Sequence, residues 1–334
     1  MNKTNLLSIV VPVYNESEGI KTFYDRLWQV VDTLPMSYEI IFIDDGSQDD
    51  SLAKMVDLAN SDPHVKVVKF SRNFGHQIAI TAGIDLSQGD AVVVIDADLQ
   101  DPPELIQNFI QKWEEGYDVV YGYREKRVGE SRLKLITAAL FYRLLRRLIN
   151  IDIPIDVGDF RLMSRRVVQQ LQRLEERDRF VRGLVSWVGF HQIGVPYARD
   201  ERYAGETKYP YRKMIQFAFD GITSFSMVPL KIASWLGYLS SLVAFLYFCS
   251  VFVQKMLGYT VKGWATIMVC LLFFGGVQLI CLGLMGEYIG RIFNEIKRRP
   301  IYIIEDIFNS NQEKPMNQDL ASQTLLTDFN NHKV

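Results

Sequence analysis

The chain has 334 residues, of which 37 are Lys or Arg and 39 are Asp or Glu, so its formal net charge is −2 at pH 7. A nearly neutral chain lacks the basic excess that binding to nucleic-acid phosphates demands, and this excludes nucleic acid as the main partner. The mean hydropathy of +0.02 is high for a chain with 23% charged residues, so the apolar residues must be concentrated in part of the sequence.

The first 125 residues alternate apolar, strand-like runs with amphipathic stretches of helical length. Strands are expected at residues 6–14, 38–45, 65–71, 90–96 and 117–124. Helices are expected between them, for example at residues 18–33 and 103–115. This order, with strands that are apolar along nearly their whole length, predicts a mostly parallel, Rossmann-like sheet covered by helices on both faces. In such α/β folds, ligands bind at the carboxyl ends of the strands.

Polar and acidic residues gather where the expected strands end. The first strand ends in PVYNE, the second in DDGSQDD, the third in SRNFGHQ and the fourth in DADLQDPP. Because the carboxyl ends of parallel strands meet at one edge of the sheet, we expect these segments to lie close together. Asp44 and Asp45, on the second strand end, can accept hydrogen bonds from a base and a ribose. We therefore interpret this edge as a ligand site.

Oxygen-bearing side chains follow the fourth strand at alternate positions. On extended backbone, residues i, i+2 and i+4 point the same way, so Asp96, Asp98 and Gln100 can present three oxygen ligands to one point. Magnesium and manganese prefer oxygen ligands and commonly combine one or two carboxylates with a substrate diphosphate. The spacing therefore predicts a divalent metal site.

Other residues near the strand ends have simpler interpretations. Asp101 and Glu104 precede a helix that two prolines open, so capping of that helix explains both acids. A helix N-cap or a turn explains Asp49 and Asp50. His76 has no acid at a spacing typical of a catalytic triad, and we interpret it as structural.

Two amphipathic stretches lead toward the apolar end of the chain. Residues 130–150 carry five basic side chains, which suit a solvated cationic face and a face against anionic lipid headgroups equally well. Residues 211–231 run directly into the first apolar segment, so we expect an interfacial amphipathic helix there.

Two long segments contain no charged residue: residues 232–253, with 22 residues, and residues 263–286, with 24. A helix needs about 20 mostly apolar residues to cross the hydrocarbon core of a membrane, so each segment can span it. Two buried core helices are the alternative, and they fit these lengths less well. The three cysteines all lie inside the segments, which favours small apolar side chains over disulfides or metal ligands.

The flanking charges predict the orientation. The basic residues after the second segment are Arg291, Lys297, Arg298 and Arg299, whereas the loop between the segments has Lys255 and Lys262. Two spans place both ends of the chain on one side, which the positive-inside rule makes the cytoplasm. The N-terminal apolar run is short and lacks a cleavage site, so no signal peptide is expected. We predict a multi-pass protein of the cell inner membrane.

These features divide the chain into five parts. We expect a cytoplasmic α/β domain at residues 1–210, the interfacial helix at 211–231, transmembrane helices at 232–253 and 263–286, and a cytoplasmic segment at 287–334. After Ile304 the sequence is rich in Asn, Gln and Asp with weak periodicity, so this tail is expected to be largely disordered.

Six motifs resemble those of a known enzyme family. VVPVYNE, IDDGSQDDS, NFGHQIAITAGID, DADLQDPPE, GDFRLMSR and YAGETKYPYRKM occur in an order and spacing similar to glycosyltransferase family 2, whose members have the GT-A fold. Within it, the sequence resembles the dolichol-phosphate mannosyltransferase-like branch. The two C-terminal spans are similar to those of the bacterial polyprenyl-phosphate (bactoprenol) glucosyltransferases of that branch. The resemblance covers residues 6 to about 300.

The resemblance implies a nucleotide-sugar site. The residues that correspond to the nucleotide pocket are Pro12, Tyr14, Glu16, Phe42, Asp44 and Ala97. Asp98 and Gln100 correspond to ligands of Mg²⁺ or Mn²⁺. Asp96 corresponds to a residue that contacts the nucleotide sugar, the metal or a metal-bound water.

The resemblance also implies residues for the phosphate groups. Arg124 corresponds to an arginine near the donor diphosphate or the lipid phosphate, and Arg202 and Lys208 correspond to a loop that closes over the phosphates. Ordinary surface cations are the alternative for all three. Asp156 and Asp159 lie in the segment on the acceptor side. Asp159 precedes Phe where many relatives have Ser-Gly-Phe, and we hypothesise that it positions or deprotonates the acceptor phosphate.

The implied reaction is the inverting transfer of a hexose, with glucose from UDP-glucose as the leading candidate, to polyprenyl (undecaprenyl) phosphate at the cytoplasmic membrane face. The same chemistry with GDP-mannose or another nucleotide sugar stays open, as does a homo-oligomer. A processive polysaccharide synthase usually carries a translocating channel and a Gln-x-x-Arg-Trp segment, and neither is recognisable here. A non-catalytic nucleotide-binding membrane scaffold is the alternative of another class.

Overall fold

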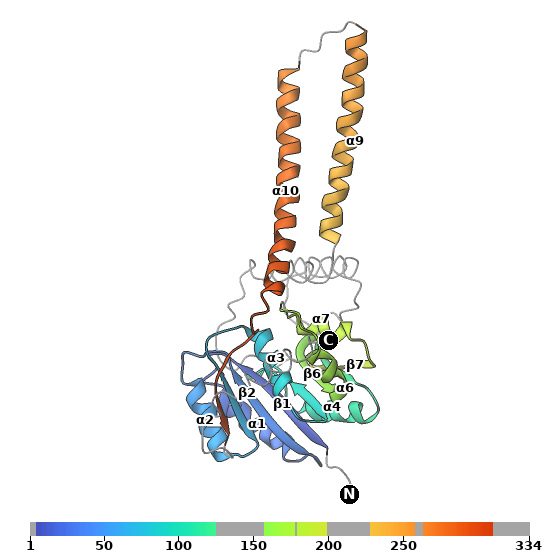
Figure 1. Ribbon diagram of the computed structural model, residues 1–334. Helices are drawn as coiled ribbons and strands as arrows, with labels where there is room; N and C mark the ends of the chain where they lie inside the picture. The colour runs from blue at the N-terminus through green and yellow to red at the C-terminus, as the bar shows by residue number, and fades with distance from the viewer. Residues whose placement is uncertain (1–4, 125–156, 178, 199–227, 258–262, 310–334) are drawn as a thin grey trace, which may run out of the picture. The chain divides into compact units, whose positions relative to one another are not determined.

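The computed structural model describes residues 5–124, 157–177, 179–198, 228–257 and 263–309 (Figure 1). The chain separates into two compact units. The first comprises Met1–Leu135, Ile153–Lys208 and Pro300–Val334, and the second comprises Ile136–Asp152 and Tyr209–Arg299. The basic stretch at residues 130–150, most of the interfacial stretch at 211–231 and the tail beyond residue 309 lie outside the described residues.

One sheet forms the centre of the first unit, and its strands within the described residues follow the order β7-β5-β6-β4-β1-β2-β3-β8. The strands are β1 (Leu6–Val13), β2 (Ser37–Asp44), β3 (Val65–Phe70), β4 (Ala91–Val94), β5 (Val119–Arg124), β6 (Val157–Ser164), β7 (Gln192–Tyr197) and β8 (Ile304–Asn309). The five strands expected from the sequence are confirmed as β1 to β5. The strands β6, β7 and β8 were not anticipated.

The strand directions decide where ligand-binding loops meet. β1 pairs in parallel with β2 and β4, and β2 pairs in parallel with β3, so the carboxyl ends of these four strands share one edge. β5 and β7 are also parallel. β6 runs antiparallel between β4 and β5, and β8 runs antiparallel along β3. The sheet is therefore mostly parallel, and the start of β6 lies at the carboxyl end of β4.

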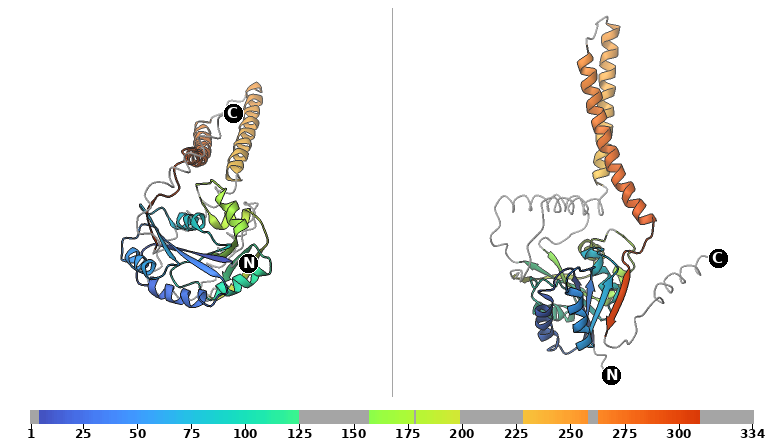
Figure 2. Two further views of the ribbon diagram at one scale, coloured as in Figure 1. Left: turned by 60° about the horizontal axis from the view of Figure 1, so that its bottom comes forward. Right: turned by 90° about the vertical axis from the view of Figure 1, so that its left-hand side faces the viewer.

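Helices cover both faces of this sheet (Figure 2). The helices of the first unit are α1 (Ile20–Val31), α2 (Ser51–Ser61), α3 (His76–Leu86), α4 (Leu105–Glu114), α6 (Arg165–Gln172) and α7 (Val181–Trp187). α1, α2 and α4 complete the apolar cluster on one face. α3 packs on the other face, with α6 and α7 beside it. The prediction of a sheet covered on both sides is confirmed.

Successive side chains of β1 point to opposite faces of the sheet, and this explains why the core has a part on each face. Leu7, Ile9 and Val11 belong to the cluster that α1 and α4 complete, while Val10 faces α3. A Cβ atom on Gly83 of α3 would stand 2.1 Å from Val10 Cγ1, so only glycine lets the helix approach the strand this closely. The contact holds α3, which begins at His76, against the sheet.

The prediction that the tail after Ile304 is largely disordered is wrong for residues 305–309, which form β8 (Ile304–Asn309) on the edge of β3. Tyr302 stacks on Phe70 with 5.4 Å between ring centroids. The register shifts between Lys69 and Phe70, and Ile304 and Ile307 both join the cluster under α3. The six residues IEDIFN are too short and too mixed in polarity to predict a strand by themselves. The edge of β3 supplies the backbone partners that make them one.

The second unit contains two long helices, α9 (Val228–Met256) and α10 (Trp264–Ile296). Two stretches are long and apolar enough to cross a membrane, Val228–Gln254 and Phe273–Ile296. Large apolar side chains on them are exposed, for example Phe245 at 62% and Leu279 at 71%. Exposed apolar surface of this extent is typical of helices that contact lipid. The three cysteines are free.

Candidate active site at the carboxyl edge of the sheet

The loops that follow β1 and β2 are joined to each other. The Asn15 N–H donates to Ser47 Oγ at 3.1 Å, and the Gln48 N–H donates to Asn15 Oδ1 at 2.8 Å. The Glu16 N–H donates to Ser51 Oγ at 2.9 Å. Asn15 has a left-handed backbone with φ of 54°, which asparagine tolerates better than most residues. These bonds fix the two loops before any ligand arrives.

The two acids at the end of β2 have different surroundings. Asp45 accepts hydrogen bonds from the Phe74 N–H at 2.7 Å and the Gly75 N–H at 3.0 Å, so its carboxylate holds the loop before α3. Asp44 accepts from the Ser47 N–H through Oδ1, whereas its buried Oδ2 has no hydrogen-bond partner. A buried oxygen without a donor is costly, and a ligand N–H or O–H would satisfy it. Asp44, rather than Asp45, therefore keeps a buried oxygen open to a ligand donor.

Of the other residues expected in the nucleotide pocket, some lie at the surface and others are buried in the core. Tyr14 is 45% exposed just beyond β1, and Glu16 lies in the loop beside it. The Phe42 ring is fully buried in the apolar core, so the structure does not bring it to the site. Pro12, within β1 opposite Ile43, is also buried. Phe42 and Pro12 therefore support the strand ends.

The segment after β4 turns sharply. Leu99 has a φ of 60°, so the extended alternation expected from Asp96 to Gln100 is interrupted, and Asp98 Oδ1 accepts from the Gln100 N–H at 3.1 Å. Asp96 Oδ1 is buried without a hydrogen-bond partner, and Ala97 is 2% exposed between the two acids. Burial raises the pKa of Asp96, and the neighbouring carboxylates of Asp159, Asp101 and Asp98 add to the rise, although the charge of His76 opposes it. A cation here would relieve the cost of ionising that acid.

These residues fit a divalent cation that shares its coordination with a ligand. Within the described residues, no group of three His, Cys, Asp or Glu side chains could hold a metal ion alone. Asp98, Gln100 and Asp96 carry oxygen atoms of the kind that serve where one or two carboxylates bind an ion and phosphate oxygens of a ligand complete its shell.

The capping interpretation of Asp101 and Glu104 is incomplete: Glu104 is the N-cap residue of α4, but both acids also bind distant residues. Asp101 is 2% exposed, and its Oδ1 accepts a hydrogen bond from the Tyr197 hydroxyl on β7. Glu104 forms a two-bond ion pair with Arg26 of α1, at 2.7 and 2.9 Å, and makes no capping hydrogen bond. Both acids join elements distant in the sequence, which helix-capping rules do not consider.

A second acid faces the site from β6. β4 and β6 pair Ala91 with Ser164 and Val94 with Arg161, so β6 begins beside the end of β4, and the Asp159 charge acts on Asp96. Two carboxylates in this relation repel. His76 Nε2 lies between them, 3.5 Å from Asp96 Oδ1 and 3.3 Å from Asp159 Oδ2. Burial lowers the pKa of His76, but the hydrogen bond to Asp159 and the charge of Asp96 outweigh it and raise the pKa to about 9.

Asp159 is the centre of a charged cluster. Arg182 of α7 donates from Nε to Oδ1 at 2.7 Å and from Nη2 to Oδ2 at 2.8 Å, and Gln77 Nε2 lies 3.3 Å from Oδ2. Burial raises the pKa of Asp159, but the charge and hydrogen bonds of Arg182 and the hydrogen bond of His76 hold it well below the usual range. A carboxylate held so firmly ionised is a weak base. Of the two hypothesised roles, the geometry favours positioning over deprotonation.

The remaining expected residues are placed only partly. Arg124 is the last residue of β5, paired with Tyr197 of β7. Asp156, Arg202 and Lys208 lie outside the described residues. The interpretation of His76 as structural missed its contacts with Asp96 and Asp159, and Arg182 was missed altogether. The only sequence signal was the motif SRNFGHQ at the end of β3, which marks His76 as near the ligand edge.

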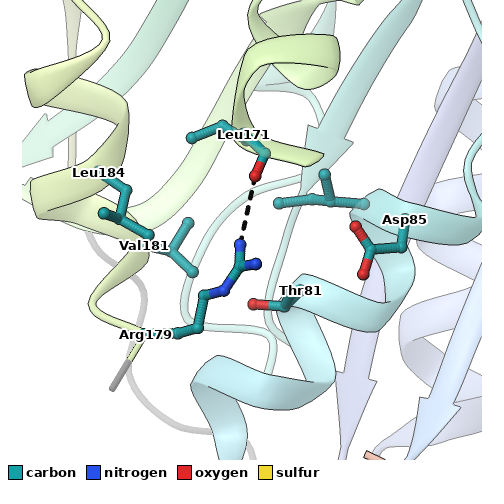
Figure 3. Close-up of a pocket in the computed structure, with 7 residues that line it drawn as sticks. Thr81, Asp85, Leu171, Arg179, Val181 and Leu184 are labelled. Atoms are coloured by element: carbon teal, nitrogen blue, oxygen red, sulfur yellow. Dashed lines mark hydrogen bonds between the residues drawn. The ribbon is translucent and has the colours of Figure 1, made fainter. Parts of the chain in front are cut away.

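A small cavity lies between α3, α6 and α7 (Figure 3). It is lined by Thr81, Ile84, Asp85, Leu171, Arg179, Val181 and Leu184, and its volume is about 10 Å³. Arg179 Nη1 donates across it to the Leu171 carbonyl at 3.3 Å. Such a volume accommodates about one water molecule, so the cavity cannot hold a nucleotide sugar.

Asp85 in this cavity makes stability depend on pH. Burial raises its pKa from 3.8 to about 6, although Arg179 and the Tyr302 hydroxyl, 3.2 Å from Oδ2, oppose the shift. Because the folded pKa exceeds the unfolded one, the folded state loses stability as the pH rises from about 4 to about 6. We expect Asp85→Asn to raise the free energy of unfolding by about 1–3 kcal/mol at pH 7.5 and to change it little at pH 4. Melting curves at both pH values check this, and equal gains at both would contradict it.

Comparisons with known proteins identify the family of this chain. Residues 8–172 match the family model described as Glycosyl transferase family 2, and residues 228–292 match the GtrB C-terminal hairpin. The protein named uncharacterized glycosyltransferase YkcC of Bacillus subtilis is 56% identical over 89% of this chain and 93% of its own length. The bactoprenol glucosyl transferase of Shigella phage SfII is 44% identical over 91% of this chain and 99% of its own length.

One solved structure shows the extent of the structural likeness. Glucosyl-3-phosphoglycerate synthase from Mycobacterium tuberculosis, crystallised with Mn²⁺, UDP-glucose and phosphoglyceric acid, is similar over 66% of this chain and 78% of that chain. The sequence identity is 21% and the TM-score is 0.44.

Proposed function

The chain belongs to glycosyltransferase family 2 and is a glycosyltransferase, and from this premise we propose that it transfers glucose from UDP-glucose to a polyprenyl phosphate. One observation carries the proposal. The relatives named bactoprenol glucosyl transferase match 90% or more of the chain. The match therefore includes both the first unit, with the acids at the sheet edge, and the apolar hairpin formed by α9 and α10. A soluble sugar acceptor would not call for such a hairpin.

The donor end of the site is supported by the loops after β1, β2 and β4. The unpartnered Asp44 Oδ2 would accept a hydrogen bond from the nucleotide, and the exposed Tyr14 ring would lie beside it. Asp98 and Gln100, with Asp96 behind them, would hold Mg²⁺ or Mn²⁺. When bound, the ion would neutralise the charge that develops on the departing nucleoside diphosphate. Arg124, Arg202 and Lys208 are proposed to assist at the phosphates.

The acceptor needs little help to become a nucleophile. A phosphate monoester has a second pKa of about 6, so it is largely a dianion at neutral pH. A strong general base is therefore unnecessary, which suits the firmly ionised Asp159. We propose that Asp159, and Asp156 near it in the sequence, organise the acceptor side, and that in-line attack inverts the sugar carbon.

The two apolar helices support a membrane arrangement. Each candidate span is long enough to cross the hydrocarbon core, and two crossings return the chain to its starting side. The basic residues that follow α10 favour the cytoplasm for that side. We therefore propose a multi-pass inner-membrane protein whose residues 1–210 and 287–334 are cytoplasmic, so that the donor and the lipid phosphate meet at the inner leaflet.

A product assay tests the proposal. Purified protein in lipid would receive undecaprenyl phosphate with labelled UDP-glucose or labelled GDP-mannose, with and without EDTA. We expect one charged lipid-linked sugar, formed from UDP-glucose and lost on chelation. Mannose transfer would identify a different donor, a polymer would indicate a processive synthase, and no product from any donor would favour the scaffold alternative.

A further inference from the structure

The ion pair between Arg182 and Asp159 presents a fixed cation at the edge of the sheet. Both carboxylate oxygens of Asp159 are engaged, at 2.7 and 2.8 Å, and this two-bond geometry sets the plane of the guanidinium group. The Asp159 side chain is 5% exposed, whereas that of Arg182 is 32% exposed. The buried acid therefore anchors an arginine that reaches solvent.

A second arginine makes this cluster attractive to an anion. Arg161 is 3% exposed on β6, and its guanidinium donates to the backbone carbonyls of Gly158 and Asp159 at 2.8 and 3.3 Å. Its charge also acts on the Asp159 carboxylate. Two guanidinium groups and His76 thus act on the Asp159 carboxylate, and the Asp96 carboxylate lies on the other side of His76.

The position of the cluster identifies the anion. Asp159 lies on β6, on one side of the acid-bearing loop after β4, while the loops suited to the nucleotide follow β1 and β2 on the other side. In-line displacement requires the attacking group to stand opposite the leaving group across the transferred sugar. A phosphate on the β6 side is therefore in the place of the attacking phosphate.

We propose that Arg182 binds the phosphate of the lipid acceptor and that Asp159 is the positioning residue that holds Arg182 in place. This inference rests on the proposed function, because it assumes that the acceptor is a phosphate monoester. Arginine suits the role since it stays charged at every relevant pH and offers several donors to phosphate oxygens.

The test is a binding titration of the full-length protein in detergent with farnesyl phosphate, without any nucleotide sugar. We expect Arg182→Gln to weaken farnesyl phosphate binding about 10- to 100-fold, since a hydrogen bond to a charged group is lost. Arg182→Lys should lie between this variant and the wild type, and Asp159→Asn should also weaken binding. Farnesol binding and UDP binding should change less than about 2-fold, because neither ligand uses the site.

Arg166→Gln is the matched control. Arg166 is a 73% exposed arginine on α6, 3.7 Å from Asp118, and this variant should bind farnesyl phosphate like the wild type. Unchanged farnesyl phosphate binding in Arg182→Gln, or a loss for UDP or farnesol instead, overturns the inference. A variant that melts early is replaced in the comparison by Arg182→Lys. Because the titration contains no nucleotide sugar, the farnesyl phosphate affinities can be interpreted even if the donor in the proposed function is wrong.

In turnover assays, the KM for the lipid acceptor should rise in Arg182→Gln while the KM for the donor stays unchanged. A merely structural role would not separate the two constants. A rise confined to the donor KM would assign Arg182 to the leaving diphosphate and refute the proposal.

Discussion

Asp98→Ala is expected to lower turnover at least about 100-fold while the protein still folds, because removing one preorganised charge contact from a transition state costs this much or more. Asp98 lies in the turn after β4, and its Oδ1 accepts a local hydrogen bond from the Gln100 N–H. Asp98→Asn can keep that bond while it removes the negative charge. Activity lost in both variants would therefore come from the missing charge rather than from a disturbed turn.

The control for this prediction lies in the same loop. Glu104 is an exposed acid paired with Arg26, and Glu104→Gln should retain near-normal turnover. The measurement is product formation at several Mg²⁺ and Mn²⁺ concentrations, with melting temperatures recorded for each variant. Asp98→Ala with wild-type turnover, or wild-type activity that survives EDTA, would refute the metal site and revive the scaffold alternative.

Truncation after Arg299 is expected to destabilise the catalytic unit by about 3–6 kcal/mol, because it removes β8 and the apolar side chains that β8 packs on the sheet. Ile307 packs in the cluster under α3, and Phe308 packs against the cluster on the opposite face. The truncation also exposes the edge of β3, and an uncovered strand edge favours aggregation. Melting temperature and the soluble fraction after mild heating report the two effects.

Truncation after Asn309 is the matched comparison, since it keeps the whole of β8 and should melt like the full chain. Among point variants, Ile307→Asp should reproduce most of the loss. Glu305→Ala should cost little, because its ion pair with Lys69, at 3.0 Å, is partly exposed. If both truncations melted at the same temperature, β8 would not contribute to stability as its packing indicates.

Most of the sheet could be predicted from local pattern. Strands β1 to β4 are apolar along nearly their whole length because both faces are covered, and acids follow them where ligands bind. The uncharged stretches near the C-terminus likewise predicted α9 and α10, because crossing a membrane requires a minimum length of apolar helix. These features depend on neighbours within one element, which a sequence displays directly.

The antiparallel strands β6 and β8 were harder to predict from the sequence. β6 lies between β4 and β5, although it follows both in the chain, and β8 joins β3 after the whole apolar hairpin. No periodicity records such pairings, since they depend on which strand edge is free when the sheet assembles. The same cause explains the error over Asp101, whose partner Tyr197 comes from β7.

By itself, the sequence determined the family, the strand ends that carry acids, and the two apolar helices, because each is written in contiguous residues. Only the tertiary structure decided which charges meet. His76 from α3, Asp159 from β6 and Arg182 from α7 converge through the β4–β6 register and the packing of α3 on the sheet. Hydrogen bonds between such distant residues depend on geometry in three dimensions, and spacing along the chain does not encode it.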